Sequence, residues 1–404
     1  MDEIVARALG DNPELRAART EVEAAAARLR QAALRPNPTL DLGGQKALGP
    51  DNTLTVGLTV PLDLNGRKEG RVGVAERELE FRRLQVADRE RRLRAEVRIK
   101  AGEVLAARRN LAVVDELIDT NRASLRLVEE RVRAGAAPAL DGGLARVEVN
   151  RLEASRPLLA SRVEVATLQL KALAGMRVAE PIVVRGDLSA APVAPDAAAL
   201  AGRLSERPDV RAAGAEIAMA EARVRRERAE GRWDASVNLG YQRQDMGFNL
   251  RGLTDTGGTR PIQDVFHFFG GGVSITLPVR NRNEGNVAAA VAEAAAAERR
   301  REFVELIARQ ELEAALAQSE AARRAVAVYE RGVRDIASAN VDVVRRSYGL
   351  GRATLLDVIA EQRRYIDVEQ GYTDVLRQVW DAAVEVERAI GGPAAAGPAP
   401  PKGR

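Results

Sequence analysis

The stretch VSITLPVRNRNEGN at 273–286 places alternating strand-forming residues before a proline, a polar turn and an alanine-rich segment. A similar stretch, VGLTVPLDLNGRKEG, occupies 56–70, where a long charged segment follows. Alternating Val, Ile and Thr are typical of half-buried strands, and a proline cannot donate to the strand ladder. One chain therefore contains the same strand-to-helix junction twice, at Pro61 and Pro278.

The repetition covers most of the 404-residue chain, because other motifs recur in the same order. NPELRAA at 12–18 matches RPDVRAA at 207–213, and the prolines of these two motifs are 195 residues apart. The two junction prolines are 217 apart, so the second copy carries 22 more residues (217 against 195). A whole-length duplication of this kind decides the fold and predicts two equivalent halves.

Each half predicts a helix, two strands, a very long helix, a tight turn and a shorter helix. No proline interrupts 62–137 or 279–392, as unbroken helices of that length require. We expect repeats at 1–190 and 191–392, followed by a disordered Pro/Ala tail at 393–404. The expected elements are 3–34, 37–46, 53–62, 65–134 and 140–174, then an irregular segment at 175–208, then 209–231, 234–245, 265–277, 286–348 and 354–390.

Both long helical segments carry the spacing of a coiled-coil seam. Leu93, Val97 and Ala101 begin a series in steps of three and four that continues to Val132, a period near 3.5. In the second segment small residues occur at the same spacing of three and four, which predicts close helix packing. They are Ala314, Ala317, Ala321, Ala325, Val328, Gly332 and Ile336.

The strand segments alternate between apolar and small polar residues, as in Leu54, Val56 and Leu58 against intervening Thr and Gly. A soluble half-buried sheet would show the same alternation. Strands of about ten residues, with a wet face of Thr, Gly, Asn and Gln, instead favour a membrane sheet around a water-filled lumen.

Aromatic residues gather at the second hairpin, where we expect an interfacial girdle or, alternatively, a packing patch. Most of the extra residues fall at 246–264, which we expect to form a long external loop. Four strands cannot close a barrel, and hydrocarbon does not tolerate open sheet edges, so a membrane-spanning chain must oligomerise. The gathered aromatics are Trp233, Tyr241, Phe248, Phe266, Phe268 and Phe269.

Composition excludes several classes of function. The 62 basic and 58 acidic residues are interleaved, whereas a nucleic-acid partner would require a one-sided basic face. With no cysteine and one histidine, thiol catalysis, disulfides and multi-histidine metal sites are ruled out. No phosphate-binding loop or catalytic triad is present, so we expect neither an enzyme nor a cofactor. The start MDEIVARAL is not a signal peptide, so we expect either a cytosolic protein or a missing N-terminal signal.

Together these features resemble the TolC-like outer-membrane efflux family, and the resemblance covers residues 3–392. LPVRNRNEGNVAAAVAEA at 277–294 is similar to the segment that marks the CzcC- and CusC-like cation-efflux branch. RVRAGAAPALDGGLARVE at 131–148 and YGLGRATLLDVIAEQRR at 348–364 resemble the two periplasmic hairpin tips of the family.

The resemblance implies a mainly α fold with a small β part. It further implies a homotrimer with a twelve-stranded barrel in outer-membrane lipid and a twelve-helix tunnel through the periplasm. A membrane-fusion adaptor would dock at the tips and connect the channel to an inner-membrane RND pump. Heavy-metal cations are the implied cargo, with drugs as an alternative.

The resemblance also assigns candidate site residues. Gly135, Gly351, Arg352 and Leu355 fall at the tips, where the adaptor would dock, and glycine permits a tight turn. Pore-gate candidates are Asp141, Asp357, Glu361 and Tyr348. The two aspartates would cap the returning helices or form a ring of negative charge at the tunnel mouth; Tyr348 and Arg352 would hydrogen-bond a neighbouring helix.

Two other readings of the sequence remain open. A periplasmic membrane-fusion adaptor also combines a coiled coil with β structure, although it would normally contain one hairpin rather than two. A soluble coiled-coil scaffold would stay monodisperse without detergent.

Overall fold

The computed structural model describes residues 1–48, 51–190 and 202–391. The chain forms two compact units. The helical unit comprises residues 1–20, 84–211 and 302 onward, and the sheet unit comprises 21–83 and 212–301. Each unit combines segments from both halves of the sequence, so the duplicated halves are not separate compact bodies.

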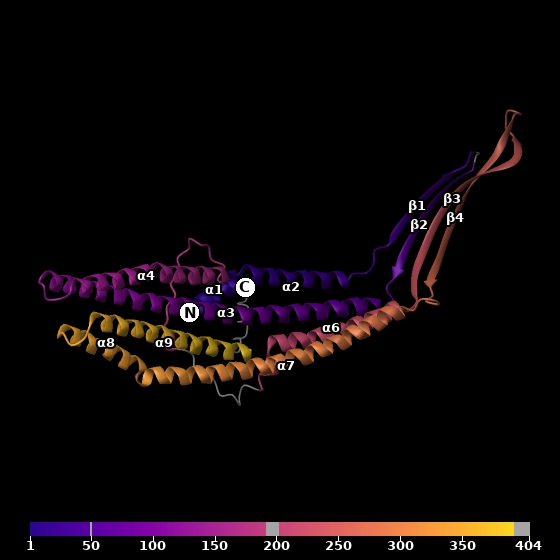
Figure 1. Cartoon of the computed structure of the whole chain (residues 1–404). Helices are drawn as coiled ribbons and strands as arrows, with labels where there is room; N and C mark the ends of the chain where they lie inside the picture. Colours follow the sequence, from indigo (N-terminus) through magenta and orange to yellow (C-terminus); the bar gives the residue numbers. More distant parts are fainter. Residues whose placement is uncertain (49–50, 191–201, 392–404) are drawn as a thin grey trace, which may run out of the picture. The chain divides into compact units, whose positions relative to one another are not determined.

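The described elements follow the predicted order (Figure 1). The predicted tail at 393–404 and part of the predicted irregular segment lie outside the described residues. In the first half they are α1 (Asp2–Asp11), α2 (Pro13–Ala32), β1 (Thr39–Lys46), β2 (Asn52–Leu62), α3 (Arg67–Arg133) and α4 (Ala139–Leu173). In the second half they are α6 (Pro208–Glu230), β3 (Asp234–Leu253), β4 (Thr259–Thr276), α7 (Glu284–Val328), α8 (Arg334–Gly349) and α9 (Leu355–Ala389), with short 3₁₀ turns at Leu188–Ala190 and Leu204–Glu206.

The predicted first helix, 3–34, is in fact two helices separated at Asn12. Pro13 disfavours a helical conformation at the preceding residue. The Asn12 side-chain oxygen accepts a hydrogen bond from the Leu15 amide at 2.9 Å, which caps the start of α2. Its amide group donates to the Leu173 carbonyl at the end of α4, also at 2.9 Å.

The predicted seam of α3 is confirmed within the helical unit. Val97, Ala101 and Val104 are fully buried and pack with α1 and α4 in one apolar cluster. Further along α3, Val114 and Ile118 pack with residues of α4 and α9. A period near 3.5 thus identified the buried side of this helix correctly.

The seam predicted for α7 was wrong. Ala314, Ala317 and Ala321 are exposed, and Ile336 in α8 is 62% exposed. The buried stripe of α7 is displaced by one or two positions. It consists of Ala308, Leu312, Ala315, Ser319 and Ala322.

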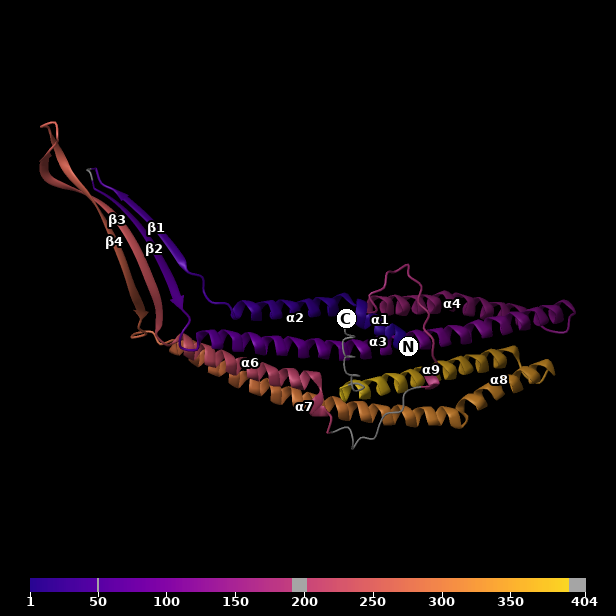
Figure 2. The ribbon, with the colours of Figure 1, turned by 180° about the vertical axis from the view of Figure 1, so that it is seen from behind.

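The predicted unbroken helix 286–348 is interrupted by a π-helical segment at Tyr329–Val333 (Figure 2). Within it Gly332 has φ 144° and ψ −12°, a conformation that a residue with a side chain rarely adopts. The bend between α7 and α8 therefore has a defined cause in one glycine.

The sheet unit contains one antiparallel sheet with strand order β1-β2-β3-β4. Its register places the leucines and valines of β1 and β2, and the apolar residues at 235–241 of β3 and 269–275 of β4, on one face, as in the neighbouring positions Leu42, Val56, Tyr241 and Phe269. The opposite face carries Thr, Gly, Asn and Gln. The predicted alternation is thus confirmed, and in the described part of the chain β1 and β4 have no further neighbour.

Two predictions for the second hairpin were wrong. The extra residues do not form a loop at 246–264, because β3 and β4 extend to a short turn at 254–258. The aromatic residues do not form one girdle: Tyr241 and Phe269 share the apolar face, but Phe248, Phe266 and Phe268 lie on the polar face. Alternation along a strand separates neighbouring residues onto opposite faces.

No helix in the described part of the chain is both long and apolar enough to cross a membrane.

Candidate functional site

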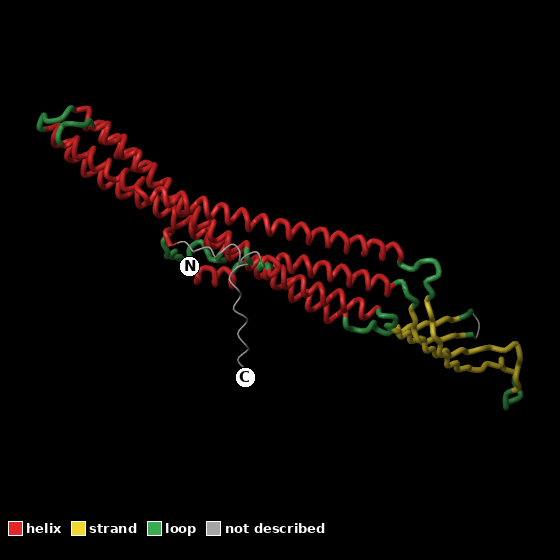
Figure 3. Tube along the Cα trace, turned by 90° about the horizontal axis from the view of Figure 1, so that it is seen from below, coloured by secondary structure: helices red, strands yellow, loops and turns green. Residues whose placement is uncertain are grey.

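Two turns form the tips, one between α3 and α4 and one between α8 and α9 (Figure 3), and they share one backbone geometry. Gly135 and Gly351 have φ of 70° and 72°. In the first turn the Ala136 amide donates to the Arg131 carbonyl at 2.7 Å, and in the second the Arg352 amide donates to Ser347 at 2.8 Å. Both helices thus end in a Schellman motif, for which glycine is the favoured residue.

The two tip aspartates have different partners. Asp357 forms a capping box with Thr354: it accepts from the Thr354 amide at 2.8 Å, and its own amide donates to the Thr354 hydroxyl at 3.2 Å. The hydrogen bond from the Thr354 hydroxyl to the Asp357 carboxylate at 2.7 Å, followed by the one from the Thr354 amide, lowers the pKa of Asp357. Asp141 instead accepts a hydrogen bond from the Tyr348 hydroxyl at 3.0 Å. Capping is therefore confirmed for Asp357 alone.

Tyr348 connects three helices of the tip. Its hydroxyl bonds to α4, its backbone belongs to α8, and the guanidinium of Arg131 in α3 lies 5.5 Å from its ring centroid. Burial, followed by the hydrogen bond to Asp141, raises the pKa of Tyr348, so its hydroxyl remains a donor. The exposed side chain of Arg352 has no hydrogen-bond or ion-pair partner among the described residues.

Leu355 is only 7% exposed and packs inside the tip with Ala145, Val358 and Ile359. This burial argues against direct contact between Leu355 and a docking partner. The sequence could have predicted this burial, because Leu355, Val358 and Ile359 lie at i, i+3 and i+4 on one face of the helix. Three leucines missed by the sequence analysis are exposed at the tips instead, namely Leu140 (69%), Leu350 (72%) and Leu356 (57%).

Ion pairs connect α4 to α9 just behind the tips. Glu148, with a side chain only 3% exposed, binds Arg151 at 2.6 Å and Arg363 of α9 at 2.9 Å. Burial alone would raise the pKa of Glu148, but the hydrogen bonds from both arginines outweigh burial and lower it. Glu361 pairs with Arg364 at 2.9 Å.

In the sheet unit, the strand-to-helix junctions depend on two asparagines rather than on the prolines alone. Pro61 lies inside β2 opposite Ser236, and Pro278 lies just beyond β4. Asn65 and Asn283 adopt left-handed φ values of 63° and 62°. The side-chain amide of Asn65 donates to the Trp233 carbonyl at 2.6 Å, and the side-chain amide of Asn283 donates to the Glu227 carbonyl at 2.9 Å.

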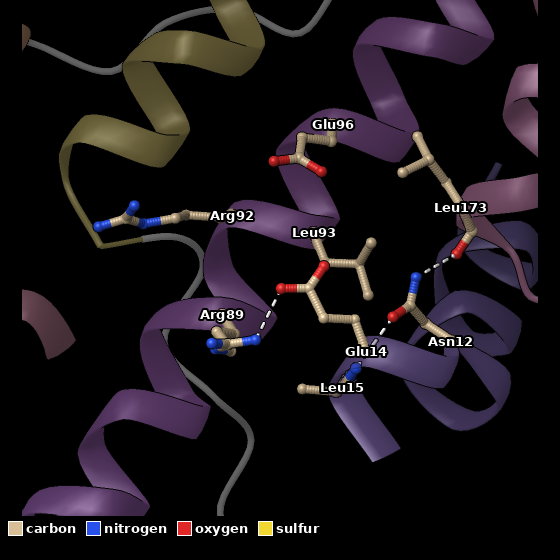
Figure 4. A pocket seen from close by; sticks show the side chains of 8 residues that line it. All are labelled: Asn12, Glu14, Leu15, Arg89, Arg92, Leu93, Glu96 and Leu173. Carbon is tan, nitrogen blue, oxygen red and sulfur yellow. Dashed lines mark hydrogen bonds and ion pairs between the residues drawn. The ribbon is translucent and has the colours of Figure 1, made fainter. Parts of the chain in front are cut away.

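A pocket of about 110 Å³ lies in the helical unit where α2 begins (Figure 4). Glu14 of α2 pairs with Arg89 of α3 at 2.7 Å across it. Burial, aided by the charge of Glu14, raises the pKa of Glu96. No histidine or nucleophile lines the pocket. The Asn12 side chain beside it connects the start of α2 to the end of α4. Across residues 1–48, 51–190 and 202–391, no three His, Cys, Asp or Glu side chains gather closely enough to hold a metal ion.

The described chain thus combines an open antiparallel sheet that has one apolar face with long coiled-coil helices. A family model described as outer membrane efflux protein matches residues 4–176 and 201–392, and the chain belongs to this family. The chain is accordingly a passive outer-membrane efflux channel subunit and not an enzyme.

One relative and several solved structures are similar to the chain over most of its length. The cobalt-zinc-cadmium resistance protein CzcC of Cupriavidus metallidurans is 27% identical over 384 residues, which cover 95% of this chain and 88% of the relative. The crystal structure of CusC has a TM-score of 0.80 at 18% identity, covering 97% of this chain and 92% of that chain. The outer membrane protein VceC of Vibrio cholerae has a TM-score of 0.76 at 18% identity, with 97% and 96% covered.

Proposed function

We propose that three copies of the chain form one exit duct through the outer membrane and the periplasm. The observation that supports this proposal is the open sheet, in which β1 and β4 are edges. Edge strands expose unpaired backbone groups, which hydrocarbon does not tolerate. Three copies supply twelve strands, and pairing of β1 with the neighbouring β4 closes the barrel without a free edge.

The apolar face of the sheet contacts lipid in this assembly, and the polar face lines the water-filled lumen. Exposure of apolar residues agrees with this orientation, because Leu42, Val273 and Phe269 are 71%, 63% and 83% exposed in one chain. The repeats 1–190 and 191–392 each supply one hairpin to the barrel and one helical hairpin to the tunnel.

The tips dock on a membrane-fusion adaptor fed by an inner-membrane RND pump, as the family membership supports. Leu140, Leu350 and Leu356 are the apolar side chains available for this contact, and Leu355 supports them from inside. Exposed apolar residues in a polar setting mark protein contacts. Asp141, Asp357 and Glu361, repeated in three copies, place negative charge at the tunnel mouth, and Tyr348 regulates its opening.

Metal cations are the proposed cargo. The support is the relative named for cobalt, zinc and cadmium resistance, which aligns with 95% of the chain. A passive duct needs no resident metal site, only an electrostatic preference at its entrance.

Three measurements test the proposal. Light scattering of the detergent-purified chain should give a trimer, and planar bilayers containing it should show discrete channels. A strain that lacks its own cation-efflux channel but keeps the adaptor and pump should regain zinc, cobalt and cadmium tolerance on expression of this chain. A monomer without conductance would refute the duct; a conducting trimer that restores only drug tolerance would refute the cargo.

A further inference from the structure

The polar face of the sheet has a hollow of about 350 Å³ on its surface. Its floor is a row of three glycines at one level of the register: Gly57 of β2 pairs with Gly240 of β3, which pairs with Gly270 of β4. Three adjacent strands thus lack a side chain at the same level. Glycine at such positions allows a ligand to approach the backbone closely.

The absence of these side chains is not required by packing. A Cβ atom built at Gly240 or at Gly270 would meet no atom within 4 Å, and one at Gly57 would meet only ordinary contacts. The backbone at all three positions is also free of the left-handed φ values that demand glycine. Neither packing nor backbone geometry therefore accounts for the open floor.

A carboxylate lines one side of the hollow. Asp41 of β1 pairs with Gly57, and its Oδ2 lies 3.9 Å from where a Gly57 Cβ would be, so the carboxylate extends over the floor. No hydrogen bond or ion pair joins the Asp41 side chain to any residue that the structure describes. An unpaired carboxylate over an open floor attracts a positively charged group.

An aromatic ring lines the other side. Phe268 of β4 pairs with Gln242 of β3, one level beyond the glycine row on the same face, and is 49% exposed. Its ring centroid lies 6.5 Å from that of Phe266, which in turn lies 6.4 Å from Phe248. Three phenylalanines thus form a continuous aromatic surface on this face, which also carries Met246 and Ile262 toward the hairpin turn.

We propose that this hollow binds hydrophobic organic cations, such as quaternary ammonium ions, between the Asp41 carboxylate and the Phe268 ring. A weakly hydrated organic cation gains from both an aromatic face and an apolar contact, whereas a small metal ion keeps its water shell. The inference rests on the proposed duct in one respect: there the polar face lines the lumen, so a bound ion lies in the path of permeation.

The test uses tetrapropylammonium as the probe, applied to the full chain in planar bilayers and, separately, titrated calorimetrically into the detergent-purified protein. Wild type should show concentration-dependent block and measurable binding. Phe268→Ala should weaken both by about fivefold, and Asp41→Asn by about threefold. The double variant Gly240→Ala with Gly270→Ala fills the floor and should weaken both while it leaves Asp41 and Phe268 in place.

Val273→Ala is the matched control, because Val273 lies on the opposite face of the same strand and does not line the hollow; it should leave block and binding unchanged. Equal effects of Phe268→Ala and Val273→Ala, or a conducting wild type that tetrapropylammonium neither blocks nor binds, would overturn the site and leave the duct intact. A chain that does not conduct, but whose calorimetric binding weakens in Phe268→Ala, in Asp41→Asn and in the double glycine variant and not in the control, would overturn the duct and support the site. Block by magnesium should be unaffected by Phe268→Ala. If this variant weakened block by magnesium as much as block by tetrapropylammonium, the site would also be overturned.

Discussion

The duplicated tip residues differ in role because their immediate neighbours differ. Thr354 precedes Asp357 by three residues and completes a capping box, whereas Pro138 precedes Asp141 by three residues and has no side-chain oxygen. Asp141 is therefore available to Tyr348. The position in the first half that corresponds to Tyr348 is Val132, which has no hydroxyl group.

The hydrogen bond from Tyr348 predicts a gating phenotype. Tyr348→Phe removes only the hydroxyl and keeps the ring beside Arg131, so it should remove about 1 kcal/mol of tip stabilisation. We expect the open occupancy of the reconstituted channel to rise about fivefold in single-channel recordings. Arg352→Ala is the control and should leave gating unchanged, because the Arg352 side chain has no hydrogen-bond or ion-pair partner in the described part of the chain. Identical recordings for Tyr348→Phe and wild type would exclude this bond from gating.

Asp381 in α9 predicts a pH dependence of stability. Burial raises its pKa from 3.8 to about 6, and its Oδ1 has no hydrogen-bond partner among the described residues. Because the folded pKa exceeds the ordinary value, stability present below pH 3.8 is lost as the pH rises through about 6. Asp381→Asn should therefore stabilise the chain by about 2 kcal/mol at pH 8.

The measurement is urea unfolding of the wild type and of Asp381→Asn at pH 8 and at pH 4.5. The gain in unfolding free energy at pH 4.5 should be less than half of the gain at pH 8. Exposed Asp374 in the same helix provides the control, and Asp374→Asn should change stability little at either pH. A gain of equal size at both values would show that titration of Asp381 does not cause it.

Among the elements, the π-helical segment between α7 and α8 is fixed by contacts from two other helices. Glu369 of α9, with a side chain 3% exposed, binds Arg334 of α8 at 2.7 Å and Arg109 of α3 at 3.2 Å. The Tyr372 ring lies between the same guanidinium groups, 4.7 Å from Arg334 and 5.2 Å from Arg109. The bend is therefore an ordered feature and not a frayed helix.

Adding one methyl group at Gly332 tests whether the backbone at this bend is strained for any residue other than glycine. Gly332→Ala places a side chain at φ 144° and should cost about 2 kcal/mol, because that conformation is strained for any residue with a Cβ. Gly214→Ala in α6 is the control: an added Cβ there meets nothing within 4 Å, so it should stabilise the helix by about 0.5–1 kcal/mol. Urea midpoints of the two variants should move in opposite directions; a shift in the same direction would contradict the strain argument.

Prediction of the elements from sequence succeeded where side-chain chemistry distinguishes the faces. The strand alternation placed Leu42 and Val56 on one face, and the large residues of α3 identified its buried side. It failed in α7, where alanines at Ala314 and Ala315 offer several stripes of equal hydrophobicity. It also failed at 246–264, because strand pairing is made by backbone hydrogen bonds and does not require alternation.

At the scale of the whole molecule, the sequence revealed the duplication but not which segments of the chain form each compact unit. Repeats are detected by similarity along the chain, whereas units are defined by contacts across it. Arg91 in the first half binds Asp209 in the second at 3.1 Å, and both are in the helical unit. Such pairings depend on tertiary packing, which a single sequence does not encode as a local pattern.

The open edges of the sheet give the most direct prediction for the assembly. Because the chain has no cysteine, every disulfide formed after substitution reports on the introduced pair. Leu42→Cys on β1 should be combined in turn with Phe269→Cys, Gly271→Cys and Val273→Cys on β4, since the register between copies is set by the tilt of the barrel strands. One combination should give covalent trimers on oxidation in outer membranes, resolved by denaturing electrophoresis.

Each single-cysteine variant is the control and can form at most a dimer. The antiparallel pairing of β1 with a neighbouring β4 brings paired Cβ atoms to about 4.5–5.5 Å, within reach of a disulfide after slight movement. Covalent trimers from one register and none from the others would show directed edge pairing. If all three double variants stayed monomeric while the channel conducted, closure would involve other edges, and the strand order across the subunit boundary proposed above would be wrong.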